Sequence, residues 1–399
     1  MEEENFTYRC YKALFRNRKL PLAYVDLDLL DKNIDLIKKR SGKTPVRIAS
    51  KSIRCTHLVK YILDSDPLFQ GIMSFSGSEA VYLSQSGFDN ILVAYPVVNQ
   101  QEIGQICGEL KKGKYINLMV DLPEHLDLLE DEGRKQGTPI PVSIDIDLSV
   151  DFPGLHFGVW RSAVRDMKSL KNLVNRIKQL KYVQLEGLMG YEAQIAGVTD
   201  HVPGQVGLNA VKRLLKKISI KKIAAKRKQT VEWIQSQGFD LKFVNGGGTG
   251  SVESTIAEPH VTEVTVGSGF YSPHLFDYYH NFSLYPAAGF ALAINRIPKD
   301  GIFTCSGGGY IASGSVEGIK APVPWLPTGA RLDANEGAGE VQTPVLYKGP
   351  ESLSIGDPVL FRHSKAGELC ERFNSLLLVK NGKVIDEVPT YRGEGKCFL

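Results

Sequence analysis

The feature that most constrains the fold is a repeated alternation between short apolar runs rich in β-branched residues and amphipathic helical stretches. Eight such runs occur at residues 46–49, 72–75, 91–94, 116–120, 142–146, 183–189, 241–244 and 264–266. Helical patterns lie between them, among them 121–134, 162–180 and a long one that ends near Gln237, where Gly238 is a stop signal. Alternating strands and helices form parallel sheets, and eight such strands predict a (β/α)8 TIM barrel.

Two changes in the residue pattern divide the rest of the chain. An earlier apolar run at 22–27 would be a ninth barrel strand, so we assign it to a different sheet. After about Asn281, helical periodicity disappears and β-rich pieces are separated by turn signals with frequent Gly and Pro. We therefore predict three segments: an N-terminal segment and strand (1–27), a barrel (28–280) and a C-terminal β domain (281–399).

The composition is that of an ordinary globular chain, with 43% hydrophobic and 23% charged residues among 399. No run of eighteen apolar residues occurs and the first twenty residues contain no apolar h-region, so we expect a cytoplasmic protein that does not bind membranes. Six cysteines without a CxxC pair indicate reduced thiols. Helical spacing is kept by Val211, Leu214, Leu215 and Ile218 within a lysine-rich stretch that lacks aromatic residues, which predicts a solvated lysine face and no nucleic-acid binding.

The first candidate catalytic residue is Lys51, which follows the run at 46–49 where a helical signal begins. The carboxyl ends of parallel strands are where barrels of this kind place their chemistry. A lysine there can form a Schiff base with an aldehyde cofactor, provided that burial and cationic neighbours such as Arg47 and Arg54 keep its amine unprotonated. A solvated loop lysine would give the same local pattern, so the assignment needs support from elsewhere in the chain.

The second informative stretch is residues 243–251, an apolar strand that enters three consecutive glycines and two hydroxyl residues. Glycines let backbone N–H groups approach an anion, Thr249 and Ser251 can add hydroxyl donors, and barrels bind phosphate in the loops after strands seven and eight. The stretch lacks the endings of a P-loop and the spacing of a dinucleotide site. The eighth run enters another glycine-rich loop with Gly267 and Gly269, so the two loops are predicted to hold one phosphate.

A strand-end lysine and a phosphate turn together describe a site for pyridoxal 5′-phosphate. The chain resembles the fold-type III pyridoxal phosphate enzymes, and within them the alanine racemase N-terminal-like group that contains D-threonine aldolase and D-serine dehydratase. The resemblance lies in residues 21–28 with Asn33, in Lys51 and in residues 246–250, and it spans most of residues 20–280.

The resemblance implies that Lys51 is the Schiff-base lysine. It also implies that the N-terminal strand crosses into the β domain and that two subunits pair head to tail as a homodimer. The cofactor-binding residues expected around the glycine loops are Asn245, Gly247, Gly248, Thr249, Gly267 and Gly269.

Two further cofactor contacts follow from the same resemblance. The segment 187–191 is similar to the family motif after strand six, which makes Tyr191 the aromatic residue near the cofactor; a tyrosine that only packs at the barrel mouth would fit equally well. Residues 151–159 align with a stretch where many relatives carry an arginine that hydrogen-bonds the phenolic oxygen of the cofactor. Here that position is His156, with Arg161 nearby, and an imidazole can donate the same hydrogen bond.

The substrate chemistry is expected in the polar stretch 361–374 of the β domain. The D-threonine aldolase and D-serine dehydratase group has a His-x-Cys or His-x-Asp pair there that holds a divalent metal, whereas this chain has His363-x-Lys365. Either His363 rebuilds a metal site with Cys370 or Glu368, or Lys365 supplies the positive charge that the metal supplies in relatives. We favour the second arrangement, in which His363 and Lys365 act on the substrate and no metal is bound.

The resemblance implies a lyase that acts on a β-hydroxy D-amino acid, by aldol cleavage or by dehydrative deamination, and the sequence does not separate the two reactions. A racemase of the alanine racemase type is the alternative, with Tyr310 as its second base; the polar stretch 363–371 argues against it. A non-catalytic carrier of pyridoxal phosphate is the least favoured hypothesis, because the small carriers have no second domain comparable to residues 281–399.

Overall fold

The computed structural model describes residues 7–314 and 318–398, and it divides the chain into two compact units. The first unit comprises Met1–Ile37, Ser52–Leu58 and Ser268–Cys397, and the second comprises Lys38–Lys51, Val59–Gly267 and Phe398–Leu399. The second unit contains the barrel. Apart from the last two residues of the chain, it lies within the range of 28–280 predicted for the barrel. No helix among the described residues is long and apolar enough to cross a membrane.

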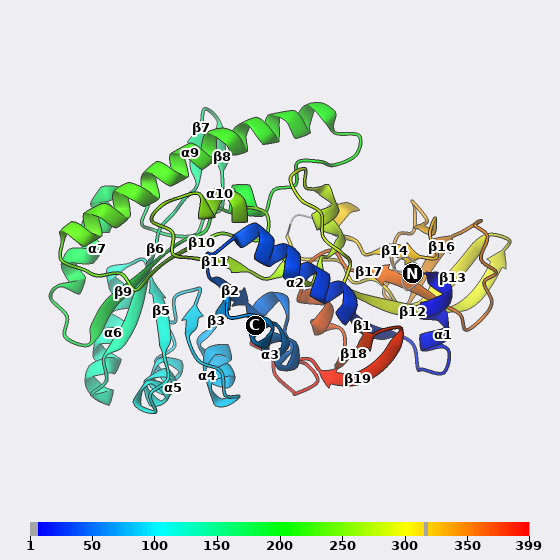
Figure 1. Ribbon diagram of the computed structural model, residues 1–399, viewed down its shortest axis with the longest axis horizontal. Helices are drawn as coiled ribbons and strands as arrows, with labels where there is room; N and C mark the ends of the chain where they lie inside the picture. Colours follow the sequence, from blue (N-terminus) through cyan, green and yellow to red (C-terminus); the bar gives the residue numbers. More distant parts are fainter. Residues whose placement is uncertain (1–6, 315–317, 399) are drawn as a thin grey trace. The chain divides into compact units, whose positions relative to one another are not determined.

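Eight parallel strands close into a barrel in the order β10-β11-β2-β3-β4-β5-β6-β9 (Figure 1). They are β2 (Val46–Ala49), β3 (Phe69–Ser74), β4 (Ile91–Val93), β5 (Ile116–Val120), β6 (Ile140–Asp145), β9 (Val183–Gly190), β10 (Phe243–Gly246) and β11 (Glu263–Val266). Each of the eight predicted runs corresponds to one of these strands, so the TIM-barrel prediction is confirmed. Strands of a barrel are covered on both faces, which is why they appear in the sequence as nearly continuous apolar runs.

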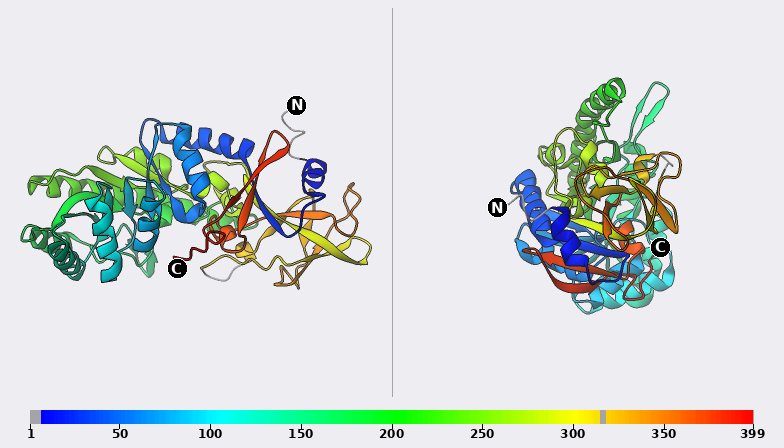
Figure 2. Two further views of the ribbon diagram at one scale, coloured as in Figure 1. Left: turned by 90° about the horizontal axis from the view of Figure 1, so that it is seen from below. Right: turned by 90° about the vertical axis from the view of Figure 1, so that its right-hand side faces the viewer.

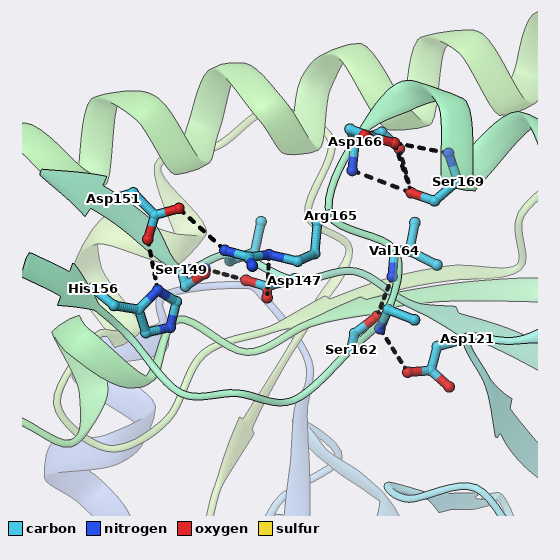
Figure 3. Close-up of polar contacts among 12 residues, drawn as sticks. Asp121, Asp147, Ser149, Asp151, His156, Ser162, Val164, Arg165, Asp166 and Ser169 are labelled. Atoms are coloured by element: carbon cyan, nitrogen blue, oxygen red, sulfur yellow. Dashed lines mark hydrogen bonds and ion pairs between the residues drawn. The ribbon is translucent and has the colours of Figure 1, made fainter.

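Helices follow the strands along the chain. They are α3 (Thr56–Ser65), α4 (Gly77–Gln85), α5 (Gln100–Lys111), α6 (Pro123–Gln136), α7 (Met167–Ile177), α8 (Ala193–Ala196), α9 (Val206–Ser236) and α10 (Val252–Ile256). Local signals explain their ends. Helix α6 stops at Gly137, which has a φ of 63°, and α7 begins with a capping box in which Asp166 and Ser169 bond each other's backbone (Figure 3).

Helix α9 corrects the prediction for its first half. Three of the four residues of the expected apolar face are exposed, namely Val211, Leu214 and Ile218, and Leu215 is half-buried. The buried side is polar instead, because it packs on the loop that precedes the helix, whose backbone needs hydrogen-bond partners. Asn209 exchanges hydrogen bonds with the backbone of Val202, and Lys216 is buried in an ion pair with Asp200 at 2.9 Å.

In the first unit, β1 (Leu22–Asp26) lies between β12 (Ala288–Lys299) and β18 (Ser375–Lys380) in a nine-stranded sheet, antiparallel to β12 and parallel to β18. The N-terminal strand therefore joins the C-terminal β domain, as predicted. The other strands of the sheet are β13 (Ile302–Ser306), β14 (Val323–Leu326), β15 (Arg331–Leu332), β16 (Gln342–Leu346), β17 (Pro358–Arg362) and β19 (Lys383–Pro389). The remaining helices are α1 (Tyr8–Phe15), α2 (Leu27–Ser41) and α11 (Ser268–Tyr271).

A buried ion pair joins two neighbouring barrel strands. Arg47 on β2 donates from Nε to Oε1 of Glu263 at 2.7 Å and from Nη2 to Oε2 at 2.9 Å. The side-chain amide of Asn245 donates to the same Glu263 at 2.9 Å and to Thr265 at 2.8 Å. Arg47 is therefore committed to the barrel interior, and removing its partner would leave an uncompensated buried charge.

We predict that Glu263→Ala lowers the free energy of unfolding by about 3 kcal/mol, because Arg47 then keeps its burial without its counter-charge. The control is Asp64→Ala, which breaks the exposed ion pair with Lys60 on α3 and should cost about 0.5 kcal/mol. Urea unfolding followed by circular dichroism measures both values. Equal effects of the two substitutions would contradict a structural role for the buried pair.

Candidate active site

The carboxyl ends of the barrel strands form one rim, and the two main candidates emerge there. Lys51 follows β2, in the 3₁₀ turn Ser50–Ser52, and is exposed. Gly247 follows β10, and only β11 lies between β2 and β10 in the barrel order. The lysine and the glycine turn therefore leave the same rim, two strands apart. Ser50 fixes the lysine turn to the adjacent strand by donating to the carbonyl oxygen of Met73 at 3.0 Å.

The glycine turn needs glycine at two positions for different reasons. Gly247 has a φ of 85°, a backbone conformation that residues with a side chain rarely adopt. At Gly248, a Cβ atom would lie 2.8 Å from Cβ of Ala196 and 3.2 Å from Cε2 of Tyr191. Ala196 and Tyr191 thus occupy the space that a side chain at position 248 would need.

A buried network of hydrogen bonds and ion pairs stabilises the glycine turn. Ser251 Oγ accepts a hydrogen bond from the backbone N–H of Gly248 at 3.1 Å and donates to Glu192 Oε1 at 3.0 Å. Glu192 in turn pairs with Arg227 of α9 at 2.9 Å, and Arg227 also pairs with Glu258. The hydroxyl of Ser251, predicted as an anion donor, is therefore engaged in holding the turn in place.

The structure places the other predicted cofactor-binding residues as follows. The amide of Asn245 is engaged in the barrel interior, as described above. The carbonyl oxygen of Thr249 accepts a hydrogen bond from Arg40 at 2.7 Å, which ties the turn to α2. Gly267 follows β11 on the same rim, whereas Gly269 lies in α11 and belongs to the first unit.

A second cluster on the rim is centred on Arg161. Its Nε donates to Oδ2 of Asp145, the last residue of β6, at 2.7 Å, and its Nη2 donates to the carbonyl oxygen of Ala94 at 2.5 Å. The guanidinium carbon lies 4.6 Å from the ring centre of Tyr95 and 5.9 Å from that of Tyr191. Arg161 thus lies between two aromatic residues that follow different strands, β4 and β9.

The pKa values of Tyr95 and Asp145 in this cluster differ from those of isolated side chains. Burial alone would raise the pKa of Tyr95, but the positive charges of Lys51 and then of Arg161 outweigh that effect and lower it. Burial raises the pKa of Asp145 to about 7, although Arg161 opposes the shift. The second carboxylate oxygen of Asp145 is buried and has no hydrogen-bond partner among the described residues. Lys51, Tyr95, Arg161 and Asp145 therefore form one electrostatic group.

His156 lies in a different setting. It belongs to β8 (Leu155–Phe157), which forms a hairpin with β7 (Val150–Phe152), and α9 contacts this hairpin (Figure 2). Its Nδ1 lies 2.6 Å from Oδ1 of Asp151 (Figure 3). Its ring stacks on that of Trp160, with ring centres 3.8 Å apart. The hairpin accounts for the difference from the sequence prediction, since Arg161, five residues later, is the residue that contacts the rim.

The residues proposed for substrate chemistry lie in the first unit, just after β17. His363 is buried, and neither ring nitrogen has a hydrogen-bond partner within residues 7–314 and 318–398. Burial, with smaller contributions from His274 and Arg362, lowers the pKa of His363 to about 3. Lys365 donates to the carbonyl oxygen of Ser313 at 2.6 Å.

The alternative metal ligands, Cys370 and Glu368, have hydrogen-bond partners other than His363. Cys370 donates from Sγ to the carbonyl oxygen of Ile53 at 3.3 Å, and Glu368 accepts from the backbone N–H of Ser313 at 3.1 Å. No group of three or more His, Cys, Asp or Glu side chains that could hold a metal ion occurs in the described part of the chain. The rebuilt metal site considered from the sequence, a pair formed by His363 with Cys370 or Glu368, therefore stays a prediction.

Sequence reasoning missed Tyr95, Asp145, Glu192 and Arg227. Tyr95 and Asp145 come at the ends of apolar runs, and that position was the signal that could have found them. Glu192 and Arg227 gave no such signal, because charged residues at these positions are ordinarily expected in solvent.

The fold is a closed parallel barrel with an added β domain whose sheet includes the N-terminal strand. A lysine and a glycine turn lie on one rim of the barrel. Together these features define a class of barrel protein. Residues 25–274 match the family model of the alanine racemase N-terminal domain. Because that match covers more than half of the chain, the protein belongs to this family.

Known relatives are distant in sequence and close in fold. The chain is 22% identical over 236 residues to 3-hydroxy-D-aspartate aldolase of Paracoccus denitrificans, covering 58% of this chain and only 54% of that relative. It superposes on D-threonine aldolase of Filomicrobium marinum with a TM-score of 0.78 at 17% identity, covering 94% and 95% of the two chains. It superposes on D-threo-3-hydroxyaspartate dehydratase of Delftia sp. HT23 with a TM-score of 0.75 at 17% identity, covering 94% and 98%.

We predict that the first unit loses stability in acid because of its buried histidines. Burial lowers the pKa of His363 to about 3 and of His274 to about 4, whereas the unfolded chain binds these protons near pH 6.5. The unfolded state thus binds more protons between these values, so stability is complete above about pH 6.5 and falls as the pH drops through that window. Urea unfolding between about pH 7 and pH 4 measures the slope.

The substitution His363→Gln should flatten this pH dependence, because glutamine does not titrate. The matched control is His57→Gln, at an exposed histidine of the same unit, which should keep the wild-type slope. An unchanged slope in the His363 variant would show that the buried imidazole does not contribute.

Proposed function

We propose that the protein is a pyridoxal 5′-phosphate-dependent lyase that acts on a β-hydroxy D-amino acid, by aldol cleavage or by dehydrative deamination. The observation that carries the proposal is the shared rim, on which Lys51 and the turn at Gly247 emerge two strands apart with a cationic side chain, Arg161, in the same group. The names of the relatives support the substrate class, since threonine and 3-hydroxyaspartate both carry a hydroxyl on Cβ.

The rim residues fit this cofactor. Lys51 offers an exposed primary amine for its aldehyde, and the glycine turn at Gly247 and Gly248 on the same rim is the proposed place for its phosphate, with the backbone N–H of Gly248 already donating to Ser251 Oγ. Arg161 takes the role that the sequence gave to His156, as the donor to the phenolic oxygen, and Tyr191 packs beside the ring. When bound, the cofactor supplies an electron-accepting ring that stabilises negative charge at Cα of the substrate.

The residues of the chain supply the proton transfers. Lys51 binds the cofactor through its amine and later moves the α-proton if the reaction is a dehydration. Burial lowers the pKa of His363 to about 3, so the ring is neutral at physiological pH; we assign it the proton of the β-hydroxyl in an aldol cleavage, for which this low pKa makes it a weak base. Lys365 supplies positive charge at the β-oxygen, which is the role of the metal in relatives.

A racemase is less well supported. Tyr310 is the candidate for its second base, and it packs against Phe290 and Phe373 with ring centres 5.0 and 5.6 Å away. Burial raises the pKa of Tyr310, which makes its phenolate harder to form. The homodimer, the cytoplasmic location and the absence of a bound metal stay predictions from the sequence.

We predict that Lys51→Ala abolishes the visible absorbance of bound pyridoxal phosphate, because Lys51 is the amine that the proposal bonds to the aldehyde. The control is Lys60→Ala, which removes an exposed lysine of α3. The protein is incubated with the cofactor and dialysed to remove the unbound part, and absorbance spectra then measure the result. Retention of the band in the Lys51 variant would remove the central assignment.

We predict that the protein converts D-threonine, D-serine or D-3-hydroxyaspartate, and that a chelator does not reduce the rate. An aldehyde and a smaller amino acid identify an aldolase, a 2-oxo acid with ammonia identifies a dehydratase, and the opposite enantiomer identifies a racemase. Lys365→Met should lower kcat about 10²-fold, because it removes the charge at the β-oxygen. Loss of activity with chelator, restored by a divalent metal, would contradict the role given to Lys365.

A further inference from the structure

Three consecutive glycines, Gly246–Gly248, lie at the end of β10 and in the turn that follows it. Glycine loses more backbone freedom on folding than any other residue, so such a turn is costly to hold in one conformation. A turn that binds an anion with its backbone gains affinity when it is ordered before the anion arrives. The residues that order this turn therefore affect its affinity for an anion.

Glu192 is connected to the turn through one hydroxyl group. The backbone N–H of Gly248 donates to Ser251 Oγ at 3.1 Å, and the hydroxyl of Ser251 donates to Oε1 of Glu192 at 3.0 Å. The hydroxyl of Thr255 donates to the same carboxylate oxygen. The peptide between Gly247 and Gly248 thus has a fixed orientation, and the neighbouring peptides can move relative to it only through two soft dihedral angles per residue.

A buried arginine holds this carboxylate in place. Arg227 donates from Nη2 to Oε2 of Glu192 at 2.9 Å and to the carbonyl oxygen of Gly190 at 3.2 Å, and from Nη1 to Glu258. It lies directly behind the turn, because a Cβ atom at Gly246 would be 2.9 Å from the same Nη2. Glu192 is 1% exposed and Arg227 is completely buried, so each needs the other as a counter-charge. One oxygen of Glu192 is thus held by the arginine while the other accepts the hydroxyl that orients the turn.

We infer that Glu192 is a positioning residue for the phosphate of the cofactor, and that it acts through Ser251 to keep the turn in the conformation that binds the phosphate. The inference rests on the proposed function, which places the phosphate at this turn. A direct electrostatic role of Glu192 has the opposite sign, because a carboxylate repels a phosphate. Glu192→Gln removes that repulsion and also weakens the hold of Arg227 on the side chain, so the direction of the change in affinity separates the two roles.

The experiment compares pyridoxal 5′-phosphate with pyridoxal, which has the same aldehyde but no phosphate. Each compound is titrated into wild type, Glu192→Gln and the control Glu258→Gln, and the absorbance of the bound aldehyde gives the dissociation constants. Glu258 pairs with the same arginine, but its carboxylate makes no hydrogen bond to the turn among the described residues. The affinity for pyridoxal phosphate divided by that for pyridoxal, called here the phosphate preference, measures what the phosphate contributes to binding.

We expect the phosphate preference to fall about 10-fold in Glu192→Gln and to keep the wild-type value in Glu258→Gln. A general loss of stability would weaken the binding of both aldehydes alike and leave the preference unchanged. An unchanged or larger preference in Glu192→Gln would therefore overturn the inference. An equal fall in Glu258→Gln would also overturn it, because the effect would then follow from the arginine and not from the contact with Ser251.

The wild-type protein separates a failure of the inference from a failure of the proposed function. If wild type prefers the phosphorylated aldehyde while Glu192→Gln keeps that preference, only the inference is lost and the proposed function stands. If wild type binds both aldehydes equally tightly, the inference is overturned, because the turn then does not hold the phosphate. If wild type binds neither aldehyde, the proposed function fails and the inference fails with it.

A second variant covers the case in which Glu192→Gln does not fold. Ser251→Ala removes the hydroxyl that joins the carboxylate to the turn, but it leaves the ion pair between Glu192 and Arg227 in place. Its phosphate preference should also fall about 10-fold. An unchanged preference in Ser251→Ala would overturn the inference, since the hydroxyl would then not transmit the effect of Glu192.

Where both single variants fold, the double variant tests whether Glu192 acts through Ser251. Two residues that act through one shared contact have effects that do not add. The double variant Glu192→Gln/Ser251→Ala should therefore show the same phosphate preference as Ser251→Ala alone. A further loss, equal to the sum of the two single effects in free energy, would overturn the inference, because the carboxylate and the hydroxyl would then act independently.

Discussion

The pairing of β11 with both β2 and β10 is the constraint on which the rest of the site depends. Val264 is the register partner of Val46 on one side and of Gly246 on the other. Both pairings are parallel, so the lysine turn and the glycine turn leave the barrel at the same end, and the register sets the last residue of β10 level with the first residue of β2. Neither turn needs to be long or adaptable, because hydrogen bonds between parallel strands determine where each one begins.

Two buried ionic groups stabilise this alignment from different directions. Arg47 and Glu263 join β2 to β11 inside the barrel, while Arg227 and Glu192 hold the glycine turn from outside. Both arginines are almost completely buried, so each needs its partner to compensate for lost hydration. The cations on the rim differ, because Lys51 remains exposed and Arg161 lies among groups that can exchange protons. The buried charges that stabilise the barrel and the charges on its rim are thus carried by different residues.

The barrel was predictable from sequence because parallel strands covered on both faces read as apolar runs at regular spacing. The Lys51 and Gly247 assignments were accessible for a related reason, since both directly follow such runs. The hairpin β7–β8 was missed because strands of three residues carry almost no periodic signal. Because the hairpin was not foreseen, the sequence prediction gave His156 the cofactor contact that an arginine makes in relatives.

Helix α9 shows a second limit of sequence reasoning. Periodicity reveals that Val211, Leu214 and Ile218 share one face, but it does not say which face packs against the protein. The neighbouring loop, with Asp200 and Val202, decided that the polar face is buried. The Arg227 network was not predictable for the same kind of reason, because its partners Glu192 and Glu258 are distant in the chain.

The most direct test of the account is a crystal structure of the protein grown with pyridoxal 5′-phosphate. The account predicts that the aldehyde carbon of the cofactor is bonded to Nζ of Lys51 and that its phosphate lies at the backbone of the turn around Gly247. A cofactor bound to another lysine, or with its phosphate away from that turn, would contradict the claim that one barrel rim holds both ends of the same molecule.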